Sequence, residues 1–66
     1  MAEQVCLNSS FLAWAEFDGG RLTLCMNGGD IYDYSGVPEF IFRGLIQAPS
    51  KGRYYNDYIK DRYDVA

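Results

Sequence analysis

Polar and apolar positions alternate most regularly over residues 21–26, RLTLCM. Leu22, Leu24 and Met26 share one face there, which is the period of a half-buried strand. Residues 10–17, SFLAWAEF, are also rich in large apolar side chains but do not alternate cleanly, so a β-bulge would be needed to keep one face buried. Residues 30–34, DIYDY, form a third candidate strand, with its tyrosines on one face. Which face of this sheet is buried stays open.

Two glycine-containing turns separate these three strands. The segments DGG at 18–20 and NGG at 27–29 are typical of tight hairpins, because glycine readily adopts the positive φ that such turns require. The sequence therefore predicts a three-stranded antiparallel meander over residues 9–34. Residues 1–8 are expected to be a leader that is ordered only in part. Such a meander can bury one face and expose the other to water.

The hydrophobic period changes after the third strand. Apolar side chains then recur at the spacing of a helix, at Val37, Ile41, Leu45 and Ala48. Pro38 and Glu39 suit the first turn of this helix, and Pro49 ends it. Gly44 lies inside it, where we expect the missing side chain to allow close contact with the sheet.

A second helix is predicted to follow, with Ser50 as its N-cap. Gly52 weakens its first turn, so residues 50–53 are either helical or a loop. The predicted fold class is α+β with the order β-β-β-α-α. Two short helices within residues 37–63 pack on one face of the meander, in a single domain spanning residues 1–66.

Length and composition favour a small globular domain. The chain has 66 residues, of which 48% are hydrophobic, and such a content argues against disorder. Aromatic side chains make up 17% of the chain and supply large buried areas to a small core. The N-terminal residues lack the charge and apolar run of a signal peptide, and no apolar run is long enough to span a membrane. We therefore expect a cytoplasmic protein without membrane association.

The residue types needed for catalysis are scarce. The chain has no histidine, which removes the commonest general base near neutral pH. Cys6 and Cys25 are its only cysteines and lack the CxxC spacing of a metal site. In a cytosolic protein they are expected to be reduced. Ser9 and Ser10 have no recognisable base or orienting group. The sequence therefore predicts no enzyme activity, no metal and no cofactor.

Charge is polarised along the chain, whose net charge is -3. Residues 1–42 contain one base against six acids, whereas residues 43–66 contain five bases against three acids. Most of these bases lie in residues 50–63, SKGRYYNDYIKDRY, among four tyrosines. Mixed cationic and aromatic side chains are typical of surfaces that bind single-stranded nucleic acid.

The order of several short motifs resembles the KTSC domain family. These motifs run from about residue 9 to residue 63 and comprise Ser9-Ser10, Leu22-x-Leu24, Gly29-x-Ile31-Tyr32-x-Tyr34, Gly36-Val37-Pro38, and Ala48-x-Ser50 to Asn56 followed by Ile59 and Tyr63. Members of this family occur at the C-terminus of some bacterial lysyl-tRNA synthetases and as short stand-alone proteins in bacteria. The resemblance implies a small module without known catalytic chemistry, for which an RNA-binding role has been suggested.

Seven side chains are the predicted nucleic-acid-binding residues: Tyr32, Tyr34, Ser50, Lys51, Arg53, Tyr54 and Asn56. The tyrosines of the third strand would form a platform on which bases stack. Ser50 and the amides after it would attract a phosphate at the start of the second helix, beside the charges of Lys51 and Arg53. Asn56 would hydrogen-bond a base or cap a neighbouring segment. In the competing interpretation the tyrosines pack in the core and the charges are ordinary solvated groups.

Two further hypotheses concern protein partners. The acidic half of the chain could dock on a basic protein or mimic nucleic acid, as a protein-interaction module or an inhibitor of the phage or mobile-element type would. A homo-oligomer is the third hypothesis, because a single sheet with Trp14 or Leu12 on an uncovered face would expose a large apolar side chain.

Overall fold

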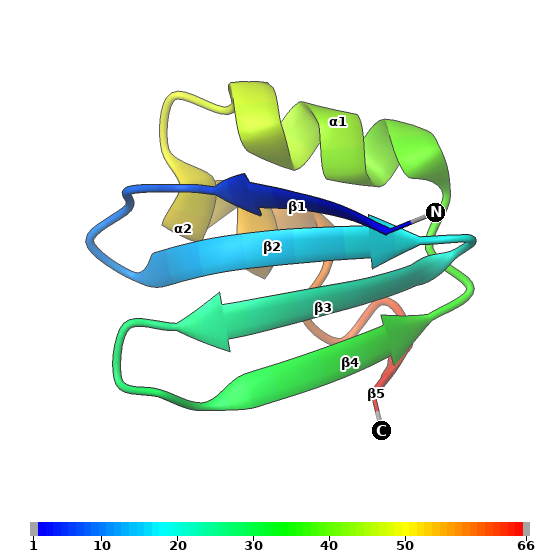
Figure 1. The fold of residues 1–66 in the computed structure, drawn as a ribbon. Helices are drawn as coiled ribbons and strands as arrows, with labels where there is room; N and C mark the ends of the chain where they lie inside the picture. Colours follow the sequence, from blue (N-terminus) through cyan, green and yellow to red (C-terminus); the bar gives the residue numbers. More distant parts are fainter. Residues whose placement is uncertain (1, 66) are drawn as a thin grey trace.

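Five strands and two helices make up the protein in this computed structural model, which describes residues 2–65. The strands form one antiparallel sheet in the order β1-β2-β3-β4-β5, so each strand lies next to its neighbour in sequence. Both helices pack on one face of this sheet (Figure 1). In chain order the elements are β1 (Glu3–Cys6), β2 (Leu12–Asp18), β3 (Arg21–Met26), β4 (Ile31–Ser35), α1 (Glu39–Gln47), α2 (Lys51–Tyr58) and β5 (Asp64–Val65).

The α+β class and the two helices are confirmed, but the three-stranded meander is wrong because the sheet has five strands. The first additional strand, β1, pairs with β2 and comes from the segment that the sequence suggested to be a leader. The second, β5, comes after both helices and pairs with β4 over only two positions. Both are short edge strands with few buried side chains, so neither produces an apolar alternation that a sequence pattern can detect.

The predicted turn chemistry is confirmed at both hairpins. Gly19 and Gly20, between β2 and β3, have φ values of 57° and 95°, as a two-residue turn with left-handed geometry requires. In the β3–β4 turn, the Met26 amide donates to the Asp30 carbonyl over 2.8 Å, and Gly29 has a φ of 98°. These turns fix the register that puts alternate residues of β3 on the core face.

The helices cover the sheet face formed by Leu22, Leu24 and Met26, all of which are buried. A register shift between Leu12 and Trp14 is the predicted β-bulge, and it lets both Leu12 and Ala15 point into the core. Leu12 is fully buried, which corrects the suggestion that it faces outward. Trp14 lies on the opposite, uncovered face, paired in register with Cys6 and Cys25.

The apolar stripe predicted for the first helix is confirmed, since all four of its positions are buried, namely Val37, Ile41, Leu45 and Ala48. The expected contact between Gly44 and the sheet is wrong, because Gly44 faces α2 instead. A Cβ atom placed on Gly44 would lie 2.2 Å from the hydroxyl oxygen of Tyr54. This hydroxyl also donates a hydrogen bond to the Ile41 carbonyl over 3.0 Å. The missing side chain therefore lets α2 pack closely against α1.

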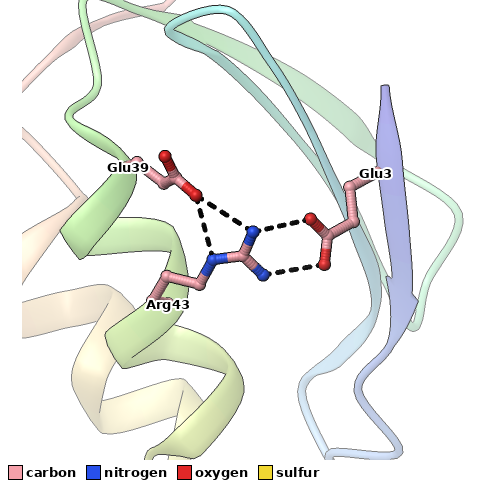
Figure 2. Close-up of polar contacts among 3 residues, drawn as sticks. All are labelled: Glu3, Glu39 and Arg43. Carbon is pink, nitrogen blue, oxygen red and sulfur yellow. Dashed lines mark hydrogen bonds and ion pairs between the residues drawn. The ribbon is translucent and has the colours of Figure 1, made fainter. Parts of the chain in front are cut away.

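An arginine in α1 ties the edge strand β1 to the helical layer (Figure 2). The two terminal nitrogens of Arg43 donate to the two carboxylate oxygens of Glu3 over 2.8 and 2.7 Å. Arg43 also donates to Glu39, one helical turn earlier, over 3.1 and 3.0 Å. The hydrogen bonds from Arg43 hold the pKa of the Glu3 carboxyl below its ordinary value. All three side chains are largely exposed, so we assign this network to positioning β1 rather than to core stability.

We predict that Gly44→Ala destabilises the protein by displacing the Tyr54 ring from α1. Overpacking of this kind costs about 1–3 kcal/mol, and the better helix propensity of alanine offsets about 1 kcal/mol of that. A contact of 2.2 Å puts this cost near the upper end of the range, so urea unfolding should show a net loss of about 2 kcal/mol in the free energy of unfolding. Gly28→Ala is the matched control, because a Cβ there meets nothing within 4 Å. Equal stability of both variants would contradict the close packing of α2 on α1.

Candidate functional site

The first part of the segment rich in bases and tyrosines forms α2, with Ser50 as its N-cap, and Lys60, Arg62 and Tyr63 follow the helix. The hydroxyl of Ser50 accepts a hydrogen bond from the Arg53 amide over 3.4 Å, as the sequence predicts. Gly52 lies within the first turn, so residues 51–53 are helical rather than a loop. Helical spacing then distributes the candidate residues around the axis of α2 instead of gathering them on one side.

The inward side of α2 carries Tyr55, whose hydroxyl lies 2.6 Å from the hydroxyl of Tyr34. Both side chains are buried, with only 5% and 4% of their surface exposed, and their rings meet edge to face at 6.2 Å. Burial and the hydrogen bond to Tyr55 raise the pKa of Tyr34 far above its ordinary value. Tyr34 is thus a core residue, and its ring is not accessible for base stacking.

Tyr54 lies on the side of α2 that faces α1, and the largely exposed Arg53 lies beside it. Arg53 forms an ion pair with Asp57, one turn later, with 3.6 Å between Nε of Arg53 and Oδ2 of Asp57. Tyr54 is half-buried, and its ring centroid lies 4.7 Å from that of Tyr58. Arg53, Tyr54, Asp57 and Tyr58 line a cleft together with Pro49, and Tyr32 is not part of its wall. The structure therefore does not bring Arg53 and Tyr54 together with the tyrosines of β4.

The other side of α2 lines two adjoining clefts. The first, of about 310 Å³, lies between the β1–β2 loop and the start of α2, and its walls are residues 7–10 and 49–52. Lys51 lines this cleft and donates to the Ala48 carbonyl over 3.0 Å, which fixes its ammonium group near the helix start. Ser50 and Gly52 complete the wall.

The second cleft, of about 400 Å³, lies between α2 and the ends of β2, β3 and β4. Two partly exposed aromatic rings line it, with Phe11 43% and Tyr32 37% exposed. The ring centroid of Phe11 lies 5.8 Å from that of the buried Tyr55, so α2 supports the Phe11 ring from beneath. Its remaining walls include Ser10, Met26, Asn27, Gly28, Asp30 and Lys60.

We call these two clefts together the α2 groove. Ser10 lines both of them, and a Cβ on Gly52 would lie 3.4 Å from the Cβ of Phe11, so the second cleft begins where the first ends. Figure 1 shows that the β1–β2 loop, the β3–β4 turn and the α1–α2 connection all lie at the same end of the molecule. Two hydrogen bonds from Asn27 join the β3–β4 turn to the β1–β2 loop. The backbone N–H of Asn27 donates to the Phe11 carbonyl over 3.0 Å, and its side-chain nitrogen donates to the Ser9 carbonyl over 2.9 Å.

Four of the seven candidate residues thus belong to one side of the molecule. Tyr32, Ser50 and Lys51 line the α2 groove, and Asn56 is exposed on the same side of α2, one turn after Gly52. Sequence reasoning missed two groove residues, Phe11 and Lys60. Phe11 lies in an apolar run next to the bulge, where the pattern does not show which side chains are exposed.

Other kinds of site find little support in the part of the chain that the structure describes. Within residues 2–65, no three His, Cys, Asp or Glu side chains gather as a metal ion would require, and no helix is long and apolar enough to cross a membrane. Cys6 and Cys25 are free thiols on β1 and β3, with Trp14 of β2 between them. Two strand spacings of about 4.8 Å place them beyond the reach of a disulfide.

Comparison with known proteins places the chain in a family. Residues 8–63 match the KTSC domain, so this protein belongs to the KTSC domain family. A solved structure of a KTSC domain protein from Yersinia pestis superimposes with a TM-score of 0.92 at 25% sequence identity, covering 100% of this chain and 96% of that one. The shared fold therefore includes nearly the whole of both chains.

Three curated relatives are lysine–tRNA ligases. The chain is 38% identical over 42 residues to the one from Nostoc punctiforme, and 43% identical over 42 residues to the one from a Nostoc species. It is 34% identical over 56 residues to the one from Trichormus variabilis. These matches cover 64% to 82% of this chain but only 8% to 10% of the ligases. The chain therefore corresponds to a small part of those enzymes.

We predict that the protein loses stability at alkaline pH through Tyr34. The unfolded chain releases the phenolic proton near pH 10, whereas the folded chain keeps it to a higher pH because the pKa of Tyr34 is raised. The unfolded state then binds fewer protons, so the free energy of unfolding falls as pH rises above about 10.

Urea unfolding between pH 8 and about 10.5 measures this slope, which Tyr34→Phe should reduce. Tyr32→Phe is the matched control, because it removes a hydroxyl on the same strand that lies outside the buried hydroxyl pair. An identical pH dependence for wild type and Tyr34→Phe would contradict the buried hydroxyl pair.

Proposed function

We propose that this KTSC domain is a non-catalytic module that binds single-stranded RNA in the α2 groove. The observation that supports this most directly is the pairing of two partly exposed aromatic rings, Phe11 and Tyr32, with a lysine in one cleft. Single-stranded nucleic acid is bound by the same combination in other proteins, because rings stack on unpaired bases and cations attract the backbone.

The aromatic part of the groove supplies the contact with bases. Tyr32 and Phe11 would each stack on an unpaired base, and such contacts contribute roughly 1–3 kcal/mol per base. Phe11 takes the role that the sequence suggested for Tyr34, because the Tyr34 ring is buried against Tyr55. This leaves the buried tyrosine pair as the support of the groove rather than as its binding surface.

The polar part of the groove supplies the contact with phosphate. The start of α2 carries the positive end of the helix dipole, and the Lys51 ammonium is fixed beside it by the Ala48 carbonyl. Asn56 is exposed on this side of α2, and Lys60, just after the helix, lines the same cleft as Tyr32. Few charges take part and the net charge of the chain is -3, so the affinity should be modest and should fall steeply with salt.

The relatives support a connection with RNA. Lysine–tRNA ligases act on a tRNA, and the matched segment is a small part of each of them. A module of this kind, alone or within a longer chain, would hold RNA without taking part in chemistry. Such a role also fits the cytoplasmic location expected from the sequence.

An NMR titration with a single-stranded RNA of about eight nucleotides tests this proposal. We expect amide shifts at low salt in residues 9–11 and 50–56 and at Tyr32 and Lys60. The uncovered sheet face around Trp14 should not shift. Absence of groove shifts at RNA concentrations of about 10⁻⁴ M would overturn the proposal.

Two variants separate the groove from the opposite side of α2. Lys51→Ala should weaken RNA binding and reduce the salt dependence by about one phosphate contact. Arg53→Ala is the matched control, because Arg53 lies outside the α2 groove and pairs with Asp57. Equal losses in both variants would indicate attraction by general charge rather than a defined groove.

A protein partner is the second candidate function, and the uncovered sheet face favours it. Cys6, Trp14, Cys25 and Ile31 form a row across β1 to β4 on this face. Ile31 is 57% exposed, and the acids Glu16 and Asp33 lie on the same face, one row away. Apolar and acidic side chains together would suit a partner with a basic, apolar surface.

Light scattering after size-exclusion chromatography distinguishes binding of a different protein on this face from binding of a second copy of the chain. A second copy would bring like charges together, so we expect a mass of 7.5 kDa for the chain alone. A dimer that Ile31→Lys disrupts, with Tyr32→Phe as the control, would contradict this expectation and assign the face to a second copy of the chain.

A further inference from the structure

A carboxylate and an ammonium line the same aromatic cleft. Asp30 and Lys60 both belong to the second cleft of the α2 groove, and both are exposed. No ion pair or side-chain hydrogen bond engages either of them within the described chain, residues 2–65. Both charged groups therefore border the space that a ligand would enter beside Phe11 and Tyr32.

The neighbouring asparagine adds an acceptor with a fixed orientation. The Asn27 side-chain nitrogen donates to the Ser9 carbonyl over 2.9 Å, which orients the amide, and no side-chain hydrogen bond within residues 2–65 uses its oxygen. The cleft thus offers acceptors at Asp30 and Asn27 and a donor at Lys60. A planar ligand that stacks on a ring in this cleft would match these groups if it has neighbouring donors on one edge and acceptors on another.

We infer that this cleft selects guanine among the bases of a single-stranded RNA, an inference that rests on the proposed function. Guanine carries two adjacent donors, N1–H and the N2 amino group, which match the two oxygens of the Asp30 carboxylate. It also carries the acceptors O6 and N7, which lysine side chains bind. Its two-ring system gives the larger stacking area against Phe11 and Tyr32.

The other bases fit the same groups less well. Adenine and cytosine each present one amino group beside a ring-nitrogen acceptor, so one carboxylate oxygen of Asp30 would face a lone pair. Uracil presents a single N3–H between two carbonyl oxygens. In each case a polar group of the cleft would lose its water without gaining a full partner, which is the usual source of selectivity between similar ligands.

Fluorescence anisotropy with octauridine RNAs that carry one central substitution tests this inference. We expect the RNA with a central guanine to bind about tenfold more tightly than the RNAs with a central adenine, cytosine or uracil, the discrimination that one good set of base-edge contacts provides. A single guanine avoids association of the RNA strands with one another. Equal affinity for all four RNAs would overturn the inference while leaving the proposed function intact, whereas no binding of any of them would overturn both.

The variant Asp30→Asn tests whether the Asp30 carboxylate is responsible for the preference for guanine. This variant replaces one carboxylate oxygen by a donor, so the ratio of the affinities for the RNA with a central guanine and for octauridine should fall to about one. Asp33→Asn is the matched control, because Asp33 accepts a hydrogen bond from Thr23 on the opposite face of the sheet. A guanine preference that survives in Asp30→Asn, or disappears in Asp33→Asn, would overturn the assignment to this cleft.

Discussion

The contact between Tyr55 and Tyr34 determines where α2 lies. Tyr55 is the only buried residue within α2, so this helix depends on a single side chain for its place on the sheet, assisted by Ile59 just after its end. The two hydroxyl oxygens lie 2.6 Å apart and form a hydrogen bond with each other. Among residues 2–65, no charged or amide side chain is buried beside them. Loss of one partner would leave the other without a hydrogen bond in the core, which is more costly than losing both.

The groove follows from this anchoring. Once Tyr55 is fixed, Phe11 rests on its ring, and Gly52 and Lys60 come to lie beside the loops at the end of the sheet. Gly44 gives the same helix its second support by admitting Tyr54. Because α2 is held on two sides, its third side is left for a ligand, and the charges of the basic tail are divided between that side and the one facing α1.

The hairpins, the inward face of β3 and the apolar stripe of α1 could be predicted, because each depends on a local period or on glycine in a turn. The strands β1 and β5 could not, because their pairing joins short polar segments to a sheet built from other residues. Tyr32 and Tyr34 share a face as predicted, yet only Tyr34 is buried, because Tyr32 lies nearer the end of the sheet, at the mouth of a cleft. The predicted binding residues of α2 also separate in the structure, because the helical spacing of α2 places neighbouring residues on opposite sides of the helix. Whether such a side chain is buried depends on where the helix lies relative to the sheet, and a sequence pattern does not predict that position.

Native-state hydrogen exchange in low concentrations of urea measures most directly whether α2 is fixed to the sheet. The amide of Ile59, bonded to the Tyr55 carbonyl, reports on α2, and the amide of Leu24 reports on the central strand β3. We expect both amides to exchange only through global unfolding, with the same free energy of opening and the same dependence on urea. Exchange of Ile59 through a separate opening of lower free energy, while Leu24 stays protected, would contradict an α2 groove that exists before any ligand binds.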